Sequence, residues 1–580
     1  MKRLIKYFKG YGTRAALGPA FKLIEALLEL FVPLVIAGII DNGILADNSA
    51  YIIKASVLLV ALGAIGLGFS VTAQYFCAKC AVGFVARLKG AMFRKIQQFS
   101  YSDIDAQGTS TMITRMTADA QKVQNGVNLA LRLLLRSPFV VFGAAIMAIT
   151  VDPKSSLSFL VIIPLSVVVF GIMLITMPMY KRVQRGTDSL LSKTRENLVG
   201  VRVIRAFCKE DEEIDEFNRR SALLTEIQKR VGGVSALLNP LTYILINMAI
   251  LCLINVGAVR VDGGELSSGQ VIALYNYMSQ ILVELIKLAN LIISISRAMA
   301  SADRIADLLD APVSERQSGV RQDGESEYAI EFKGAALRYP GASESSVRGV
   351  DLAIKRGQTL GVIGGTGSGK TSLISLIPGF YPSSEGEVLV NGVNVKDYDP
   401  AYLRSRVGIV PQKAVLFKGT IRDNMKWGNK DATDEDILRA LAIAQATGVA
   451  EEKGGLDADI SQGGKNLSGG QKQRLTIARA LVADPDILIL DDSASALDYA
   501  TDAALRKSLK ELSGSTTVVI VSQRASSVMN ADHIIVLDDG EVVGVGTHES
   551  LLADCQIYRE IYLSQFESGD AHQKEVAVNG

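Results

Sequence analysis

The chain has 580 residues, which is too long for one hydrophobic core and predicts at least two domains. Hydrophobic residues make up 48% of it, while its formal net charge is only +1. A balanced charge excludes the basic surface typical of nucleic-acid-binding proteins, so we expect no nucleic-acid partner. Five scattered cysteines likewise exclude a disulfide framework.

The apolar residues are concentrated in residues 15–300, whereas residues 320–570 have the composition of an ordinary α/β domain. A helix needs about 20 mostly apolar residues to cross the hydrocarbon core of a membrane. Six segments meet this requirement and are predicted to span the lipid bilayer: 18–44, 53–77, 129–151, 157–180, 236–259 and 269–298.

Charged residues interrupt the first and the last of these spans. In the first span, Glu25 and Glu29 share one helix face, and Lys22 lies one turn earlier. Charges inside a membrane are costly and are often functional. These carboxylates either line a polar cavity that favours cationic amphiphiles, or pair with Lys22 or lie near the membrane surface. The same two interpretations apply to Arg132, Arg136, Glu284 and Lys287.

Basic residues are concentrated in the N-terminal segment and in the connections 78–128 and 181–235, while the other connections carry few. Because basic loops remain on the cytoplasmic side, both termini are expected to be cytoplasmic. The two long connections are expected to continue as helical hairpins that contact the domain after the last span. The start MKRLIKYFKGYGTRAA lacks a cleavage or transit pattern, which favours the plasma membrane of a bacterium.

Cys77 and Cys80, in the sequence CAKC, have the spacing of a metal-binding or redox pair. They follow an apolar run, and no second Cys or His pair completes a tetrahedral site. We therefore interpret them as small residues packed within a helix.

The composition changes sharply after the last span. The segment LLDAPVSERQSGVRQDGESEYAIEF mixes Ser, Gly, Pro and charged residues and is typical of a linker. Short β-rich runs then alternate with helical ones, which predicts a mainly parallel sheet. We predict an α-helical transmembrane domain (1–315), a linker (316–328), an α/β nucleotide-binding domain (329–566) and a disordered tail (567–580).

The segment TLGVIGGTGSGKTSLISLIP joins an apolar strand to a helix through Gly364-x4-Gly369-Lys370-Thr371. This is a phosphate-binding P-loop in its required context, in which backbone N–H groups and a helix N-terminus face the phosphates. Lys370 supplies a positive charge, and Thr371 a hydroxyl for Mg²⁺. The predicted ATP-binding set is Gly364, Gly365, Thr366, Gly367, Ser368, Gly369, Lys370, Thr371 and Ser372. Asp491, which follows the buried run ILIL, suits a water-mediated contact with the same Mg²⁺.

Between these elements lies NLSGGQKQRLTIARAL, whose LSGGQ signature (467–471) resembles that of the ATP-binding cassette (ABC) transporter family. Six spans ahead of one cassette resemble a half-transporter of the exporter type. The resemblance implies that Ser468, Gly469, Gly470 and Gln471 close over the γ-phosphate bound by the opposite subunit. It also implies that Asp498, at the end of SALD, crosses the interface between two cassettes.

Two further positions match the family locally. Tyr339 in LRYPG stands where the family stacks an aromatic ring on adenine, although an ordinary edge-strand tyrosine is the alternative. Gln412 in IVPQKAVLF resembles the glutamine that contacts Mg²⁺ and faces the membrane helices. The segment DIDAQGTSTMITRMTADAQKVQ resembles the exporter segment that docks on a cassette, and ENLVGVRVIRAFCKEDEEIDEF has the corresponding position in the second hairpin. Solvated helix faces are the alternative for both.

The chain departs from the family at two catalytic positions. Asp492 stands where the family has a glutamate that polarises the attacking water, and its carboxylate reaches about 1 Å less. Gln523, in VVIVSQRASS, stands where the family has a histidine. An amide can hydrogen-bond to phosphate but cannot carry a proton as imidazole does. Together the two changes predict a site that binds ATP but hydrolyses it poorly.

An intact signature beside a degenerate site resembles the heterodimeric multidrug exporters of bacteria. We therefore expect a homologous half-transporter as partner, with hydrolysis mainly at the site completed by this chain's signature. The expected cargo is an amphipathic small molecule, with drugs, lipids and peptides all open. A homodimeric exporter with slow ATP hydrolysis and an ATP-gated, channel-like relative are the alternatives; an importer permease is disfavoured because its spans and cassette usually occupy separate chains.

Overall fold

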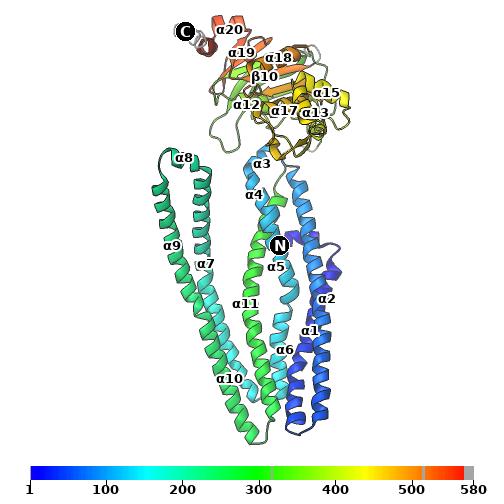
Figure 1. Ribbon diagram of the computed structural model, residues 1–580, viewed down its shortest axis with the longest axis vertical. Coiled ribbons are helices and arrows are strands. Elements are labelled where there is room, and N and C mark those ends of the chain that lie inside the picture. The colour runs from blue at the N-terminus through cyan, green and yellow to red at the C-terminus, as the bar shows by residue number, and fades with distance from the viewer. Residues whose placement is uncertain (1, 315–317, 512–515, 567–580) are drawn as a thin grey trace. The chain divides into compact units, whose positions relative to one another are not determined.

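The computed structural model describes residues 2–314, 318–511 and 516–566. Its contacts divide the chain into two compact units, Met1–Lys95 with Ser110–Ala311, and Ile96–Thr109 with Pro312–Gly580. The first unit is helical and the second contains the β-sheets (Figure 1). The predicted fold class, a helical membrane domain fused to an α/β domain, is confirmed. The tail 567–580 lies outside the described residues.

The first unit consists of helices, several of which are long. Their bounds are η1 Lys2–Phe8, α1 Gly12–Gly38, η2 Ile39–Ile44, α2 Ser49–Ile96, α4 Thr109–Thr114, η3 Arg115–Asp119, α5 Ala120–Leu133, α6 Arg136–Val151, η4 Ser155–Val161, α7 Ile162–Val199, α8 Val201–Ala206, α9 Glu210–Ala236, α10 Leu238–Asp262 and α11 Ser268–Asp310. The helices α2 and α11 have 48 and 43 residues, well beyond the length of a single membrane crossing. The helices α7 and α9 run side by side and are joined by the short α8 (Figure 1).

Five helical stretches among the described residues are long and apolar enough to cross a membrane: Gly12–Ile44, Ser49–Ile96, Thr109–Val151, Glu210–Asp262 and Ser268–Asp310. Each contains one of the predicted spans. The other predicted span, 157–180, falls on η4 and α7, in a stretch where several side chains are not described, and stays a prediction.

The helix α11 packs against α1, α5 and α6 and forms the centre of the first unit. Its buried residues include Leu274, Tyr277 and Ile281, and the Tyr277 hydroxyl donates to the carbonyl of Leu30 at 2.7 Å. Small residues on α6 permit close packing, since a Cβ on Gly143 would come 2.5 Å from a methyl of Leu30. These residues thus form an apolar core where α11 packs against its neighbours.

Two main sheets form the second unit. Its strands are β1 Tyr328–Leu337, β2 Val347–Lys355, β3 Thr359–Gly364, β4 Glu385–Val390, β5 Val393–Asn394, β6 Val407–Val410, β7 Gly419–Thr420, β8 Asp459–Ile460, β9 Ile487–Asp491, β10 Thr517–Ser522, β11 His533–Asp538 and β12 Glu541–Gly546. Its helices are α3 Tyr101–Gln107, α12 Lys370–Ser375, α13 Pro400–Arg406, α14 Ile421–Met425, α15 Asp434–Ile443, α16 Thr447–Lys453, η5 Gln462–Gly464, α17 Gly469–Leu481, α18 Tyr499–Glu511, α19 Ala525–Val528 and α20 His548–Asp554.

The larger sheet has the order β12-β11-β3-β10-β9-β6, in which only β12 is antiparallel to its neighbour. This matches the predicted mainly parallel sheet. The sequence did not predict the second sheet, β2-β1-β4-β5, whose pairs are antiparallel. The connection 338–346 between β1 and β2 is too short for a helical crossover, so these strands pair in the antiparallel sense.

The described part of the expected linker is attached to the second unit. Val320 forms a parallel bridge with Tyr398, and the Arg321 guanidinium donates to Asp399 Oδ2 at 2.9 Å. The segment 96–109 is also part of this unit. A capping box of Ser100 and Asp103 begins its helix α3, and Asp103 accepts hydrogen bonds from both the backbone and the hydroxyl of Ser314.

Candidate nucleotide site

The predicted P-loop connects β3 to α12 in the second unit. β3 is a buried strand, and Gly367 and Gly369 have φ values of +86° and +92°, which favour glycine. A side chain at Gly369 is also excluded by space, because a Cβ there would come 2.4 Å from the carbonyl oxygen of Ser346. Because these glycines carry no side chain, the loop backbone before α12 is not covered. An anion can therefore approach the N–H groups at the start of this helix.

Lys370, the first residue of α12, is buried and folds back over this loop. Its ammonium donates to the carbonyl of Gly364 at 2.9 Å, to that of Gly365, and to the Ser368 hydroxyl at 3.4 Å. Burial lowers the pKa of Lys370, and the nearby carboxylates of Asp491 and Asp492 oppose this only in part. A buried ammonium held mainly by carbonyl dipoles fits an anionic phosphate group.

Two of the three residues predicted to contact Mg²⁺, Thr371 and Asp491, lie side by side. The Thr371 hydroxyl donates to both carboxylate oxygens of Asp491, at 3.1 and 3.2 Å. Asp491 is buried at the end of β9, and burial raises its pKa. One hydroxyl and one carboxylate suit Mg²⁺, which commonly takes its other ligands from phosphate and water. The residues present therefore fit a nucleotide with one Mg²⁺ ion.

Asp492 and Gln412 are neighbours, as their predicted roles require. The Gln412 amide lies 3.4 Å from Asp492 Oδ2, at the long end of hydrogen bonding. Asp492 has a φ of +47°, in the left-handed region, and its backbone N–H donates to the carbonyl of Val521 at 3.0 Å. The acid is thus fixed by its backbone at the end of the sheet, and only its short side chain can move.

Gln523 follows β10, which lies between β3 and β9 in the sheet. Its side chain is exposed. Its backbone is held by Gln565, in the helix 556–566: the Gln565 amide nitrogen donates to the carbonyl of Gln523 at 2.8 Å, and its oxygen accepts from the N–H of Ala525 at 2.9 Å. The sequence analysis missed Gln565, because a single glutamine 42 residues away gives no pattern.

Tyr339 lies beside the P-loop helix. Its hydroxyl is 3.1 Å from that of Ser372, and its ring meets Tyr381 edge to face, with centroids 4.8 Å apart. Tyr381 in turn donates to Asp105 Oδ2 at 2.6 Å, and Tyr101 stacks on Phe380 at 4.2 Å. Aromatic contacts therefore connect the segment 96–109 with the predicted adenine position, a link that sequence motifs alone did not indicate.

The signature begins the helix α17. Ser468 caps this helix and forms a capping box with Gln471, whose amide also donates to Glu452 at 3.2 Å. Ser468 and Gly469 are exposed. Within the described chain, no hydrogen bond or ion pair joins residues 468–471 to the P-loop of the same subunit. The start of this helix is exposed, and its free N–H donors suit an anionic ligand that is bound by another subunit.

Asp498 has a local structural role in addition to its predicted one. Its carboxylate accepts from the backbone N–H and the hydroxyl of Thr501, at 2.9 and 2.8 Å. The hydrogen bond from the Thr501 backbone lowers the pKa of Asp498. Asp498 thus caps α18, and its predicted place at an interface stays a prediction.

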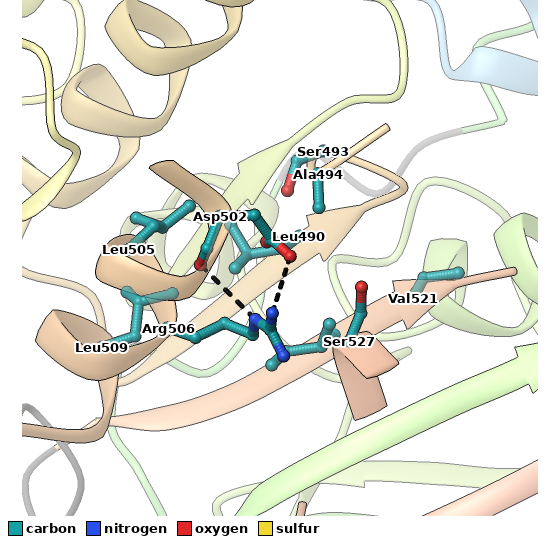
Figure 2. A pocket seen from close by; sticks show the side chains of 10 residues that line it. Leu490, Ser493, Ala494, Asp502, Leu505, Arg506, Leu509, Val521 and Ser527 are labelled. Atoms are coloured by element: carbon teal, nitrogen blue, oxygen red, sulfur yellow. Dashed lines mark hydrogen bonds and ion pairs between the residues drawn. The ribbon is translucent and has the colours of Figure 1, made fainter. Parts of the chain in front are cut away.

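A cavity behind β9 is too small for a ligand. It has a volume of about 10 Å³, close to the space that a single water molecule needs, and is lined by Leu490, Ser493 and residues of α18. Figure 2 shows Arg506 reaching back to Asp502, with an ion pair of 3.0 Å. Burial raises the pKa of Asp502, an effect that Arg506 opposes. Arg506 also donates to the carbonyl of Ser526, so this pair joins α18 to α19.

A helical membrane unit joined in one chain to a P-loop cassette with a signature helix defines a half-transporter of the exporter type. Family models match both parts: "ABC transporter transmembrane region" matches residues 16–285, and "ABC transporter" matches residues 347–495. The chain therefore belongs to the ABC transporter family, and its cassette implies ATP binding.

Curated relatives align along nearly the whole chain. An uncharacterized ABC transporter ATP-binding protein of Mycobacterium tuberculosis is 34% identical over 97% of both chains. A probable multidrug resistance ABC transporter ATP-binding/permease protein of Bacillus subtilis is 31% identical, also over 97% of both. An ATP-dependent lipid A-core flippase of Hahella chejuensis is 30% identical over 98% of this chain and 100% of its own length. This protein is thus a multi-pass membrane protein with an ATPase-coupled transport architecture.

Proposed function

We propose that this chain is one subunit of an ATP-driven exporter that moves amphipathic small molecules out of the cytoplasm. The fusion of membrane helices and cassette supports export, and the relatives named as a multidrug transporter and a lipid A-core flippase support cargo of mixed polarity. The basic connections support a cytoplasmic cassette and cytoplasmic termini in the plasma membrane of a bacterium. The transmembrane domain extends to residue 315, the linker covers 316–328 and the cassette covers 329–566.

The chain's own ATP site is degenerate, and the pair Asp492 and Gln523 carries this proposal. The site retains what binding needs, because Lys370, Thr371 and Asp491 are gathered at the ends of β3 and β9. Hydrolysis needs a base within hydrogen-bond reach of the attacking water. The backbone of Asp492 is held by Val521, so its carboxylate cannot advance by the length of the absent methylene without moving the end of the sheet.

The partner is a homologous half-transporter whose catalytic residues are intact. The signature of this chain, Ser468 to Gln471, supports that role because its helix start is exposed and capped. The tip of the second hairpin supports it too, since Val199, Val203 and Phe207 are exposed apolar residues around α8. An apolar tip on two long charged helices is suited to insertion into another subunit's cassette.

Co-expression with candidate half-transporters encoded by the same genome tests the proposal. Inverted membrane vesicles containing the complex should accumulate an amphipathic dye against its gradient when ATP is added. They should stop when the partner's catalytic glutamate is changed to glutamine. Equilibration without accumulation would favour a channel-like protein, and a native mass of two identical chains with full activity would favour a homodimeric exporter.

A further inference from the structure

The first unit contains a cavity among three helices that is partly polar. It has a volume of about 270 Å³ and lies between α1, α6 and α11. Its polar lining consists of Glu29, Asn276, Ser279, Gln280, Glu284 and Lys287. Three valines, an isoleucine and Pro33 form the rest of the wall. The volume is close to that of small ligand pockets, so it accommodates a head group and the first part of an apolar chain.

Three residues of the lining, Glu29, Glu284 and Lys287, belong to an ion network. The guanidinium of Arg136 donates to Glu29 at 2.6 Å and to Glu284 at 2.7 Å. Glu284 also accepts from the Ser137 hydroxyl at 2.8 Å and from Lys287 at 2.9 Å. The network therefore joins α1, α6 and α11 through charged groups that sequence analysis could not pair.

The charges of the network are balanced. Arg136 and Lys287 oppose Glu29 and Glu284, and Glu25, which shares a helix face with Glu29, is instead paired with Lys22 at 2.5 Å. A ligand with a net charge would leave one charge uncompensated in a medium of low polarity, which is unfavourable. The charge balance of the network therefore argues against a preference for cationic ligands, which was one interpretation of Glu25 and Glu29 from the sequence.

One acidic and one basic side chain that line the cavity remain accessible to a ligand. Arg136 and Glu284 are nearly buried, with side chains 10% and 4% exposed, whereas those of Glu29 and Lys287 are 43% and 50% exposed. The cavity thus presents a half-exposed carboxylate on one hand and a half-exposed ammonium on the other.

We propose that this cavity binds a zwitterionic amphiphile. Glu29 takes its ammonium group, Lys287 takes its phosphate or carboxylate, and the apolar wall takes the start of its chain. A zwitterion adds a matched pair of charges to a matched set, so every new charge gains a partner. That this ligand is the exported cargo rests on the function proposed above.

The test is equilibrium binding to the full-length complex in nanodiscs of phosphatidylglycerol, which carries no ammonium group. Three radiolabelled probes share one chain and differ in charge: dodecylphosphocholine, dodecyltrimethylammonium and dodecyl phosphate, each below its micelle concentration. We expect the zwitterion to bind roughly ten-fold more tightly than either single-charge probe, because it forms one more ion pair than either of them. Equal binding of all three would overturn the proposal.

Two variants should change the selectivity in opposite directions. Glu29→Gln leaves a net positive cavity and should favour dodecyl phosphate, whereas Lys287→Gln leaves a net negative one and should favour dodecyltrimethylammonium. Glu25→Gln, one helical turn from Glu29 but paired with Lys22, is the matched control and should leave the order of the probes unchanged. Retained ATP binding and gel-filtration behaviour show that each variant is folded, and parallel shifts in both variants would contradict the assignment.

Two further comparisons are needed. The first distinguishes a peptide ligand from a lipid head group, and the second distinguishes the proposed binding site from the proposed export function. Competition by trileucine with free termini, but not by its N-acetylated form, indicates a free peptide, and competition by dodecylphosphocholine alone indicates a lipid head group; both agree with zwitterion binding. Zwitterion binding without ATP-driven export would overturn the proposed function and leave the site. Export without head-group selectivity would do the reverse.

Discussion

Asp492 combines an unusual backbone with a short side chain. Aspartate is among the residues that most readily adopt the left-handed region in which it lies, so the fold tolerates it well there. Glutamate would extend the carboxylate towards the attacking water. We expect Asp492→Glu with Gln523→His to raise phosphate release at this site by on the order of 100-fold. Phosphate release by the purified complex in nanodiscs, with the partner's glutamate changed to glutamine, measures this.

The matched control adds Asp491→Asn to the same double variant. Loss of the buried carboxylate that pairs with Thr371 removes a predicted Mg²⁺ contact and should abolish the gain. Unchanged phosphate release in the double variant, with ATP binding intact, would show that the shortened acid does not limit hydrolysis.

Lys370 and Asp491 should also narrow the pH range of Mg–ATP binding. Phosphate binding needs the ammonium of Lys370, whose pKa burial lowers, so affinity should fall with rising pH before the ordinary value of 10.5 is reached. Mg²⁺ binding needs the carboxylate of Asp491, whose pKa burial raises, so affinity should fall with decreasing pH while still above 3.8. Fluorescence titration with trinitrophenyl-ATP across this range measures both limits, and an affinity that follows the ordinary pKa values at both ends would contradict the prediction.

Among the elements, the segment 96–109 accepts one hydrogen bond from the hydroxyl of Tyr381, beside its contacts with Ser314 and Phe380. Burial and the Asp105 carboxylate raise the pKa of Tyr381, so its hydroxyl stays a donor to Asp105. Tyr381→Phe removes this charge-assisted hydrogen bond but keeps the ring against Tyr339. We expect hydrogen–deuterium exchange in 96–109 to become about ten-fold faster, while ATP affinity is unchanged. Asp105→Asn, which keeps an acceptor, is the control and should have a smaller effect.

Local motifs explain why much of the cassette could be predicted. The P-loop glycines, Lys370 and the run before Asp491 act through neighbours in sequence, and parallel pairing of β3, β10 and β9 brings them together. The ion network could not be predicted, because Arg136 meets Glu29 and Glu284 over separations of 107 and 148 residues. The hydrogen bonds between the Gln565 side chain and the backbone of Gln523 and Ala525 are equally non-local. Such pairings depend on helix packing, which charge pattern alone does not determine.

At the scale of the whole molecule, the proposed heterodimer would make the two halves of this cassette unequal. In that proposal its P-loop serves the degenerate site, while its signature completes the partner's competent one. We therefore expect Ser468→Arg, which blocks the exposed start of α17, to lower phosphate release by the complex by on the order of 100-fold. Lys370→Ala should lower it only a few-fold, because the site that it weakens contributes little hydrolysis.

The difference between these two variants distinguishes a heterodimer from a homodimer more directly than the total rate of ATP hydrolysis does. In a homodimer each site combines the P-loop of one copy with the signature of the other, so Lys370→Ala and Ser468→Arg would disable both sites alike. In the heterodimer the two variants differ, and the corresponding changes in the partner should give the opposite order. Phosphate release by four singly changed complexes, each checked for intact mass, makes the comparison. Equal losses in all four would contradict a division of labour between the sites, whatever the residual rate at Asp492.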